Sequence, residues 1–269
     1  MTERALNDNG NGSRLQRRIR ELRYGARYLV SAYPSVYIPW ARRHYGPTGI
    51  VVVGPDTELV IEGFGRSGST FAVDAFEMVQ ARPVKIAHHT HAAAQVIEGA
   101  RLGIPTLVLV RQPLQAALSH MVRRNIPPRP PLTGWIRYHR RILAVRNRIV
   151  LSRTEVLSTG LGEMIRRVNE RFGTSFAVFE PTEEHVAQVF EGIERRNRER
   201  YAGAPVSLAR PTAEREARKA ELRGQLEHPS LAPLRERALA VYRELFSSPN
   251  DATSGGMSAG TSIDGTIAE

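Results

Sequence analysis

Short apolar runs alternate along the middle of this chain with segments whose apolar residues recur every three or four positions. The short runs, bounded by Gly, Pro and Asp, indicate buried strands, and the longer periodic segments indicate helices. Strands that are apolar throughout are typical of a parallel sheet covered on both faces, so we predict an α/β fold. The predicted strands are Ile50–Val53, Leu59–Glu62, Val84–Ala87, Thr106–Val110 and Ile149–Ser152, and the predicted helices include the segment after Thr70, Ala92–Leu102, Pro113–Arg124 and Leu161–Phe172.

The two ends of the chain differ from this α/β core, which we place at 49–180. In 14–48, apolar residues at helical spacing alternate with arginines, which predicts a basic amphipathic helix. Such a helix either packs on the domain with a solvated basic face or lies on an anionic membrane surface. The part from 181 to 246 predicts helices only, at Glu183–Tyr201, Ala213–Leu226 and Leu231–Phe246, as a helical C-terminal part of the same domain. The polar segments 1–13 and 247–269 are predicted to be disordered tails.

Composition excludes several classes of protein. With 41% hydrophobic and 24% charged residues, the 269-residue chain is neither fibrous nor disordered as a whole. The absence of cysteine rules out disulfides, iron–sulfur clusters, thiolate zinc sites and a cysteine nucleophile. No apolar run approaches the ~18–20 residues of a spanning helix, and the N-terminus lacks the pattern of a signal peptide. We therefore expect a cytoplasmic protein, with peripheral membrane contact through 14–48.

The net charge of +11 points to an anionic partner. Of the 38 basic residues only Lys85 and Lys219 are lysine, and no Asp or Glu occurs between Glu98 and Glu155. Arginine forks suit phosphate and sulfate. Nucleic acid is not expected, because the arginines are not interleaved with stacking aromatics and no nucleic-acid-binding module is present.

The segment Gly63–Thr70 carries the strongest chemical signal. A strand leads into a glycine-rich turn and then a helix, which points backbone N–H groups at an anion. The spacing of Gly63 and Gly68 is that of a Walker A loop, and it predicts a P-loop-type parallel sheet flanked by helices. The lysine expected after the second glycine is replaced by Ser69, and the cation of this loop is Arg66.

At this point the sequence resembles the sulfotransferase family, whose donor is 3′-phosphoadenosine-5′-phosphosulfate (PAPS). Arg66-Ser67-Gly68-Ser69-Thr70 is similar to the family's 5′-phosphosulfate loop. The run Leu107–Val110 followed by Arg111-Gln112-Pro113, with Ser119 eight residues after the arginine, is similar to its 3′-phosphate motif. A weaker match is Arg153-Thr154-Glu155-Val156-Leu157. The resemblance implies that Arg66, Ser67, Gly68, Ser69, Thr70, Arg111 and Ser119 bind PAPS.

The resemblance also implies a general base that accepts the proton of a hydroxyl acceptor. Many members of the family place Thr-His after the second strand, and Thr90-His91 matches that pair. We therefore predict His91 as base and Arg66 as the catalytic cation at the leaving phosphate oxygen. Asp74 and Glu77 are the alternatives, because other sulfotransferases use a carboxylate. No metal is expected, since the histidines at 88, 89 and 91 have no nearby carboxylate or thiol in the sequence.

The leading hypothesis is a PAPS-dependent sulfotransferase that moves a sulfuryl group by in-line transfer to a hydroxyl acceptor, such as a carbohydrate or glycolipid. A kinase or NTPase on the same fold is one alternative. A non-catalytic anion-binding P-loop protein is another. The missing Walker lysine and the separate Arg111/Ser119 motif favour the first hypothesis, because PAPS carries two separate anionic groups.

Overall fold

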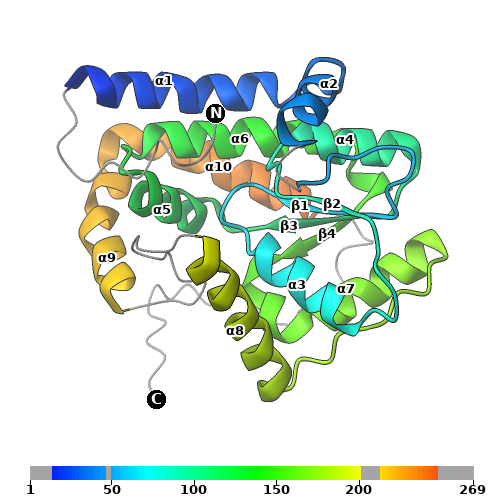
Figure 1. Cartoon of the computed structure of the whole chain (residues 1–269). Helices are drawn as coiled ribbons and strands as arrows, with labels where there is room; N and C mark the ends of the chain where they lie inside the picture. The colour runs from blue at the N-terminus through cyan, green and yellow to red at the C-terminus, as the bar shows by residue number, and fades with distance from the viewer. Residues whose placement is uncertain (1–13, 47–49, 201–212, 248–269) are drawn as a thin grey trace.

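The computed structural model describes residues 14–46, 50–200 and 213–247. A four-stranded parallel sheet of order β2-β1-β3-β4 lies at the centre of the molecule, with helices on both faces (Figure 1). The predicted α/β fold with a parallel sheet flanked by helices is confirmed. The strands are β1 (Leu59–Gly63), β2 (Ile86–His88), β3 (Thr106–Val110) and β4 (Val150–Arg153).

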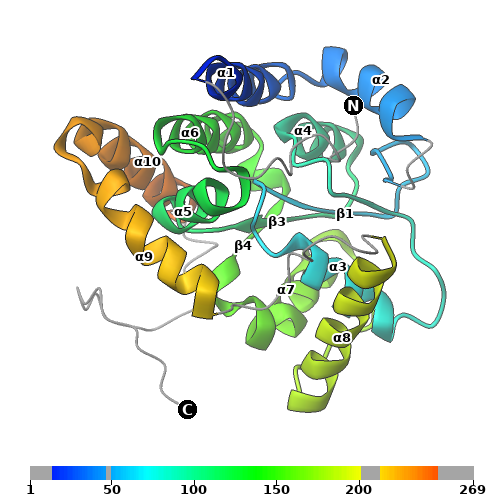
Figure 2. The same cartoon turned by 60° about the vertical axis from the view of Figure 1, so that its left-hand side comes forward.

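The described helices belong to two layers and an outer cover (Figure 2). One face of the sheet carries α4 (Ala93–Leu102), α5 (Pro113–Arg124), α6 (Arg129–Leu143), α9 (Ala213–Glu227) and α10 (Ala232–Leu245). The other face carries α3 (Ser69–Val79), α7 (Leu157–Phe172) and α8 (Glu183–Arg200). Outside α6 and α4 lie α1 (Arg14–Val30) and α2 (Pro34–Tyr45). Short 3-10 turns occur at Arg146–Arg148, Thr154–Val156 and Pro229–Leu231.

Successive side chains along a strand point to opposite faces of the sheet, so each strand contributes to the core on both faces. Leu107 and Leu109 of β3 pack with α3 and α7, whereas Val108 and Val110 pack with α5 and α6. All five residues of β3 are buried, as expected for a strand whose two faces are both covered. The continuous apolar character that predicted this strand therefore reflects burial on both sides.

The predicted strand Ile50–Val53 is wrong. This segment has no regular structure, although it runs beside β2 and the carbonyl of Val51 accepts from the amide of His88. The amide of Val53 donates to the side chain of Gln95, at 3.0 Å. Because a side chain, and not a neighbouring strand, satisfies that amide, the apolar run lies beside the sheet without joining its ladder.

Helix α6 was not predicted from the sequence, although many of its residues are buried. Leu132, Trp135, Ile136 and Ile142 are buried in the cluster on this face of the sheet, at the spacing of one helical stripe. The prolines at the helix start concealed the pattern, although proline is tolerated in a first turn because its missing N–H has no partner there.

The C-terminal helices share the two core clusters with the sheet. Leu222 and Leu226 of α9 and Val241 of α10 are buried with α5 and α6, whereas α8 packs on α3. Their bounds agree with the predicted helices to within a few residues. The predicted disordered tails, 1–13 and 247–269, lie outside the described residues apart from Ser247.

Candidate functional site

The glycine-rich segment forms a tight turn between β1 and α3. A Cβ atom on Gly63 would lie 2.4 Å from the carbonyl oxygen of Leu109, so only glycine lets β1 turn this close to β3. Gly68 has φ +81°, in the left-handed region that glycine adopts without strain, and it is the N-cap of α3. The two glycines that suggested an anion loop therefore set its backbone path.

The N-terminus of α3 is open toward this loop. The helix has no acidic residue in its first turn and no side-chain cap. Within the described chain, the buried hydroxyl of Ser67 has no hydrogen-bond partner. Because the first N–H groups of a helix lack partners within it and carry partial positive charge, they favour an anion. The loop therefore fits a phosphate or sulfate group.

Arg66 contacts both residues of the motif that the resemblance assigns to the 3′-phosphate, while Arg66 itself belongs to the 5′-phosphosulfate motif. Its Nε donates to the hydroxyl of Ser119 on α5, at 3.1 Å, and its own carbonyl accepts from Nη1 of Arg111, at 3.0 Å. Arg66 has φ 69°, a left-handed conformation that is uncommon outside glycine and that the surrounding contacts must hold. Three predicted donor-binding side chains therefore come together at the ends of β1 and β3.

The third, weaker motif also touches this site. The hydroxyl of Thr154 donates to the carbonyl of Ser67, at 3.1 Å, and a carboxylate oxygen of Glu155 accepts from the amide of Gln112, at 3.0 Å. Gln112 is the N-cap residue of α5. Its side-chain oxygen accepts from two amides in the first turn of α5, so it caps that helix as a shorter polar residue would.

The histidine segment after β2 lies against the loop. Nδ1 of His91 is 3.0 Å from the carbonyl oxygen of Gly63, so Nδ1 donates and Nε2 is left as the basic nitrogen. Burial, together with the nearby charges of Arg27 and Arg124, lowers the pKa of His91 to about 4. His91 is therefore neutral near pH 7, as a general base must be.

The other two histidines of this segment are also held in place. Nε2 of His89 lies 3.0 Å from the hydroxyl of Thr70 in the loop, and the rings of His88 and His89 are in contact. His89 and His91 both have positive φ, at 61° and 49°. Burial lowers the pKa of His88 to about 4. The segment thus takes a strained path that brings two imidazoles to the loop.

The carboxylate of Glu62, a residue not predicted as part of the site, binds the histidine segment after β2. The side chain is fully buried at the end of β1, next to Gly63. One carboxylate oxygen accepts from the backbone amide and the hydroxyl of Thr90 and from the side-chain amide of Gln95, each at 2.8 Å. Both oxygens lie within 3.3 Å of the backbone amide of His91. Burial raises the pKa of Glu62 to about 7, against the opposing effect of these hydrogen bonds. The signal in the sequence that could have identified Glu62 is a charged residue within an otherwise apolar strand.

Helix α1 covers the site from the outside. Arg27 donates to the carbonyl of Thr90, at 3.1 Å, and the hydroxyl of Tyr24 lies 3.3 Å from Nδ1 of His120. Nε2 of His120 is 2.8 Å from the carbonyl of Gly65 in the loop. His120 is buried and contacts the loop backbone, so it supports the loop and has no free nitrogen for catalysis. The basic N-terminal helix is therefore part of the wall of the site.

The two carboxylates considered as alternative bases lie on α3. Asp74 forms an ion pair with Arg196 of α8. Burial raises the pKa of Asp74 to about 6 and raises that of Glu77 as well, while Arg196 opposes both effects. The ion pair holds Asp74 toward α8, whereas His91 points at the backbone of the loop. The choice of base nevertheless stays a prediction.

Two further findings concern metal ions and membranes. In the described part of the chain, no group of three or more His, Asp or Glu side chains is placed to hold a metal ion. No helix among the described residues is both long enough and apolar enough to cross a bilayer.

Fold and site together define an α/β protein with an open, glycine-rich anion loop and a second arginine site at the next strand end. No protein-family model matches the chain, and no curated protein matches it. Among solved structures the chain is similar to a mouse sulfotransferase, SULT7A1, in complex with PAP. The identity is 12%, the match covers 78% of this chain and 92% of that one, and the TM-score is 0.41.

Proposed function

We propose that this protein is a sulfotransferase that moves a sulfuryl group from PAPS to a hydroxyl acceptor. The observation that carries the proposal is the joining of two anion-binding motifs through Arg66, whose side chain contacts Ser119 and whose carbonyl accepts from Arg111. A donor with two separate anionic groups needs two such sites on neighbouring strand ends.

Each site suits one end of PAPS. The open N-terminus of α3, the unpaired hydroxyl of Ser67 and the cation of Arg66 suit the 5′-phosphosulfate. In this proposal Ser69 and Thr70, the first residues of α3, offer backbone amides to the same group. Arg111 and Ser119 supply a charged fork and a hydroxyl for the 3′-phosphate. Desolvation lowers the pKa of Arg111 without removing its charge, because guanidinium stays protonated in proteins.

In the proposed reaction His91 and Arg66 act on opposite sides of the sulfur. Nε2 of His91 accepts the proton of the acceptor hydroxyl as the acceptor oxygen forms its bond to sulfur. The bond between sulfur and the phosphate oxygen breaks, and Arg66 stabilises the negative charge that develops on that oxygen. The products are the sulfated acceptor and 3′-phosphoadenosine-5′-phosphate. His91 returns its proton to solvent.

The acceptor class follows from the charge of the surroundings. The arginine-rich, acid-free stretch between Glu98 and Glu155 favours an acceptor that is itself anionic, such as an acidic carbohydrate or the head of a glycolipid. The hydroxyl must reach Nε2 of His91, which faces away from the carbonyl of Gly63.

A thermal-shift experiment separates this proposal from the alternatives. We expect 3′-phosphoadenosine-5′-phosphate at 100 times its Kd to stabilise the chain by about 2.7 kcal/mol. That corresponds to a rise in Tm of roughly 5–10 °C for a domain of this size. ATP with Mg²⁺ and AMP should stabilise it far less. At the same ligand concentration Arg111→Ala should reduce the shift to about half or less, whereas Arg101→Ala, at an exposed arginine paired with Glu98, should retain it.

Activity is then measured as sulfate transfer from labelled PAPS to a panel of hydroxyl acceptors. Stabilisation by ATP with Mg²⁺ but not by the bisphosphate would favour a kinase or NTPase. No stabilisation by either nucleotide would contradict donor binding altogether. Binding of the bisphosphate without transfer to any acceptor would leave a non-catalytic binder.

A further inference from the structure

An exposed apolar surface covers the outer side of α1 and α2. We name it the α1–α2 apolar face. Among the described residues, seven of the nine large hydrophobic side chains that are exposed belong to it: Ile19, Leu22, Leu29, Val30, Tyr33, Val36 and Trp40. Leu22 is 73% exposed and Val36 is 59% exposed. Isolated exposed apolar residues are ordinary, but a cluster of this kind marks an interaction site.

Helix α1 has two apolar faces with different roles. Tyr24 and Tyr28, four residues apart, are buried against α6 and the anion loop. Ile19, Leu22 and Leu29 follow one another at helical spacing on the other side and face solvent. Packing on the domain therefore explains the tyrosines, whereas the part of the chain that the structure describes leaves the aliphatic stripe exposed.

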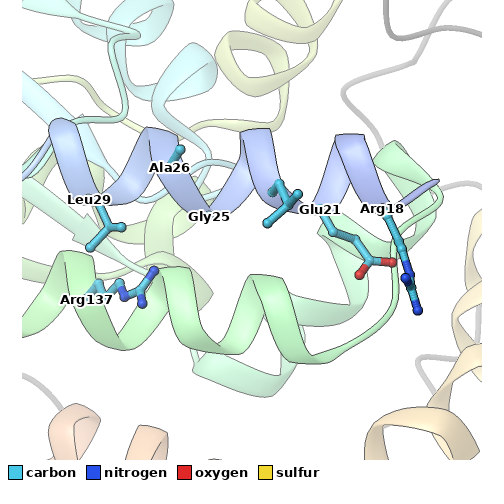
Figure 3. A pocket seen from close by; sticks show the side chains of 7 residues that line it. Arg18, Glu21, Gly25, Ala26, Leu29 and Arg137 are labelled. Carbon is cyan, nitrogen blue, oxygen red and sulfur yellow. The ribbon is translucent and has the colours of Figure 1, made fainter. Parts of the chain in front are cut away.

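A shallow groove runs along this stripe between α1 and α6 (Figure 3). Leu29 of α1 and Arg137 of α6 point toward one another across it, and Arg18 and Glu21 lie together at the other end of the view. Its lining includes Leu22, Gly25 and Ala26, and none of the predicted donor-binding residues. The groove is thus an apolar surface bordered by arginine, separate from the site.

The charge around this face is strongly positive. The segment 14–45 contains eight arginines and one glutamate, a net charge of +7. Arg18, Arg23 and Arg43 are exposed there. Two such faces would repel one another, so the charge disfavours a second copy of this chain as the partner. An anionic bilayer offers both the negative charge and the apolar depth that the face requires.

We propose that the α1–α2 apolar face binds the surface of an anionic membrane, with α1 lying in the interface plane. Leu22, Leu29 and Val36 enter the boundary between headgroups and acyl chains, and the arginines contact lipid phosphates. Trp40, which is half exposed, lies at headgroup depth, where indole is favoured. This inference does not depend on the proposed sulfotransferase activity.

The test is binding of the full chain to vesicles of phosphatidylcholine with 30% phosphatidylglycerol, measured by co-sedimentation. The chain has two tryptophans, and Trp135 is fully buried, so a blue shift of fluorescence on binding reports Trp40. Trp40→Phe should remove that shift. We expect binding that weakens between 50 and 500 mM salt and is absent with pure phosphatidylcholine.

Paired variants test the two components of the face. Leu22→Gln combined with Leu29→Gln should weaken binding about tenfold or more, because two side chains lose their apolar burial. Arg18→Gln and Arg43→Gln should each weaken it roughly fivefold and reduce the salt dependence. The matched controls are Met78→Gln and Arg166→Gln, both exposed on helices at the opposite face of the sheet, and both should bind normally.

Two results would overturn the proposal. One is no binding to anionic vesicles, or binding that these variants and salt leave unchanged. The other is a stable dimer in light scattering that the leucine double variant converts to monomer, since the face would then be covered by a second copy. All altered residues are at the surface, so circular dichroism of each variant should match the wild type.

Discussion

Glu62→Gln gives the sharpest test of the site, because it removes one buried ionisable group and keeps its shape. The carboxylate accepts from Thr90, Gln95 and His91, and all of these partners are within 3.3 Å. Glutamine retains one acceptor oxygen and places an NH₂ group where the second oxygen was, facing N–H donors. The mismatch costs about 1–3 kcal/mol of unfolding free energy, a term that does not depend on pH.

The part of the unfolding free energy that depends on the titration of Glu62 decreases as the pH rises. The pKa of Glu62 is raised by burial from 4.5 to about 7, so the folded chain holds this proton more tightly than the unfolded chain does. The stability contributed by Glu62 is therefore full below pH 4.5, falls as the pH rises through 7, and is constant above that. At ~1.4 kcal/mol per pH unit, the loss over this window is about 3 kcal/mol.

The assay is urea unfolding of wild type and Glu62→Gln at half-unit steps from pH 4.5 to 8. The buried histidine His139, whose pKa is lowered by burial, titrates in both proteins and cancels in the difference. We expect the unfolding free energy of wild type minus that of the variant to fall by about 3 kcal/mol across the window. A difference that is flat, or that rises with pH, would refute the reasoning, since Glu62 would then have an ordinary or a lowered pKa.

Three further outcomes follow from the contacts. Arg111→Ala should weaken binding of 3′-phosphoadenosine-5′-phosphate by ~10–150-fold, and Ser119→Ala should weaken it less; equal losses for an analogue without the 3′-phosphate, measured by titration calorimetry, would place Arg111 elsewhere. His91→Ala should lower kcat by ~10²–10⁴-fold at unchanged donor affinity and remove an acid limb that lies near pH 4 in the wild type, whereas near-normal turnover across pH would exclude His91 as base. Gly63→Ala should lower the unfolding free energy by about 1–3 kcal/mol or more in thermal melts, because its Cβ would meet the carbonyl of Leu109. The control Gly192→Ala, at a position with open space on α8, should raise it by about 1 kcal/mol.

Features that depend on adjacent residues could be predicted from the sequence. The strand before Gly63, the turn at Gly68 and the helix from Ser69 form one continuous segment, so spacing alone predicted the glycine-rich turn between β1 and α3. The same holds for Arg111 after β3, where an apolar run ends in a charge. The contact between Arg66 and Ser119 spans 53 positions and follows only from the register of β1 beside β3.

Features that depend on distant partners were missed or wrong. A glutamate inside an apolar strand gives no hint that Thr90 and Gln95 will satisfy it, since the pairing needs β1 and β2 side by side. The run Ile50–Val53 was apolar enough for a strand, but the amide of Val53 donates to the side chain of Gln95 and not to a neighbouring strand. In both cases a polar side chain from another element decides the local structure, and periodicity carries no information about such a partner.

Thr90 shows how the separate parts of the molecule act on one side chain. Its amide and hydroxyl donate to Glu62 of β1, and its carbonyl accepts from Arg27 of α1 at 3.1 Å. The hydroxyl of Tyr37 on α2 also donates to that carbonyl, at 3.4 Å. Three elements, β1, α1 and α2, therefore bind the polar groups of Thr90, which is how the positive φ of His91 next to it can be sustained. The orientation of His91, the proposed base, is thus set by elements that carry none of the predicted donor-binding residues. Because α1 is one of them, the helix that we propose to lie on a membrane also supports the wall of the site.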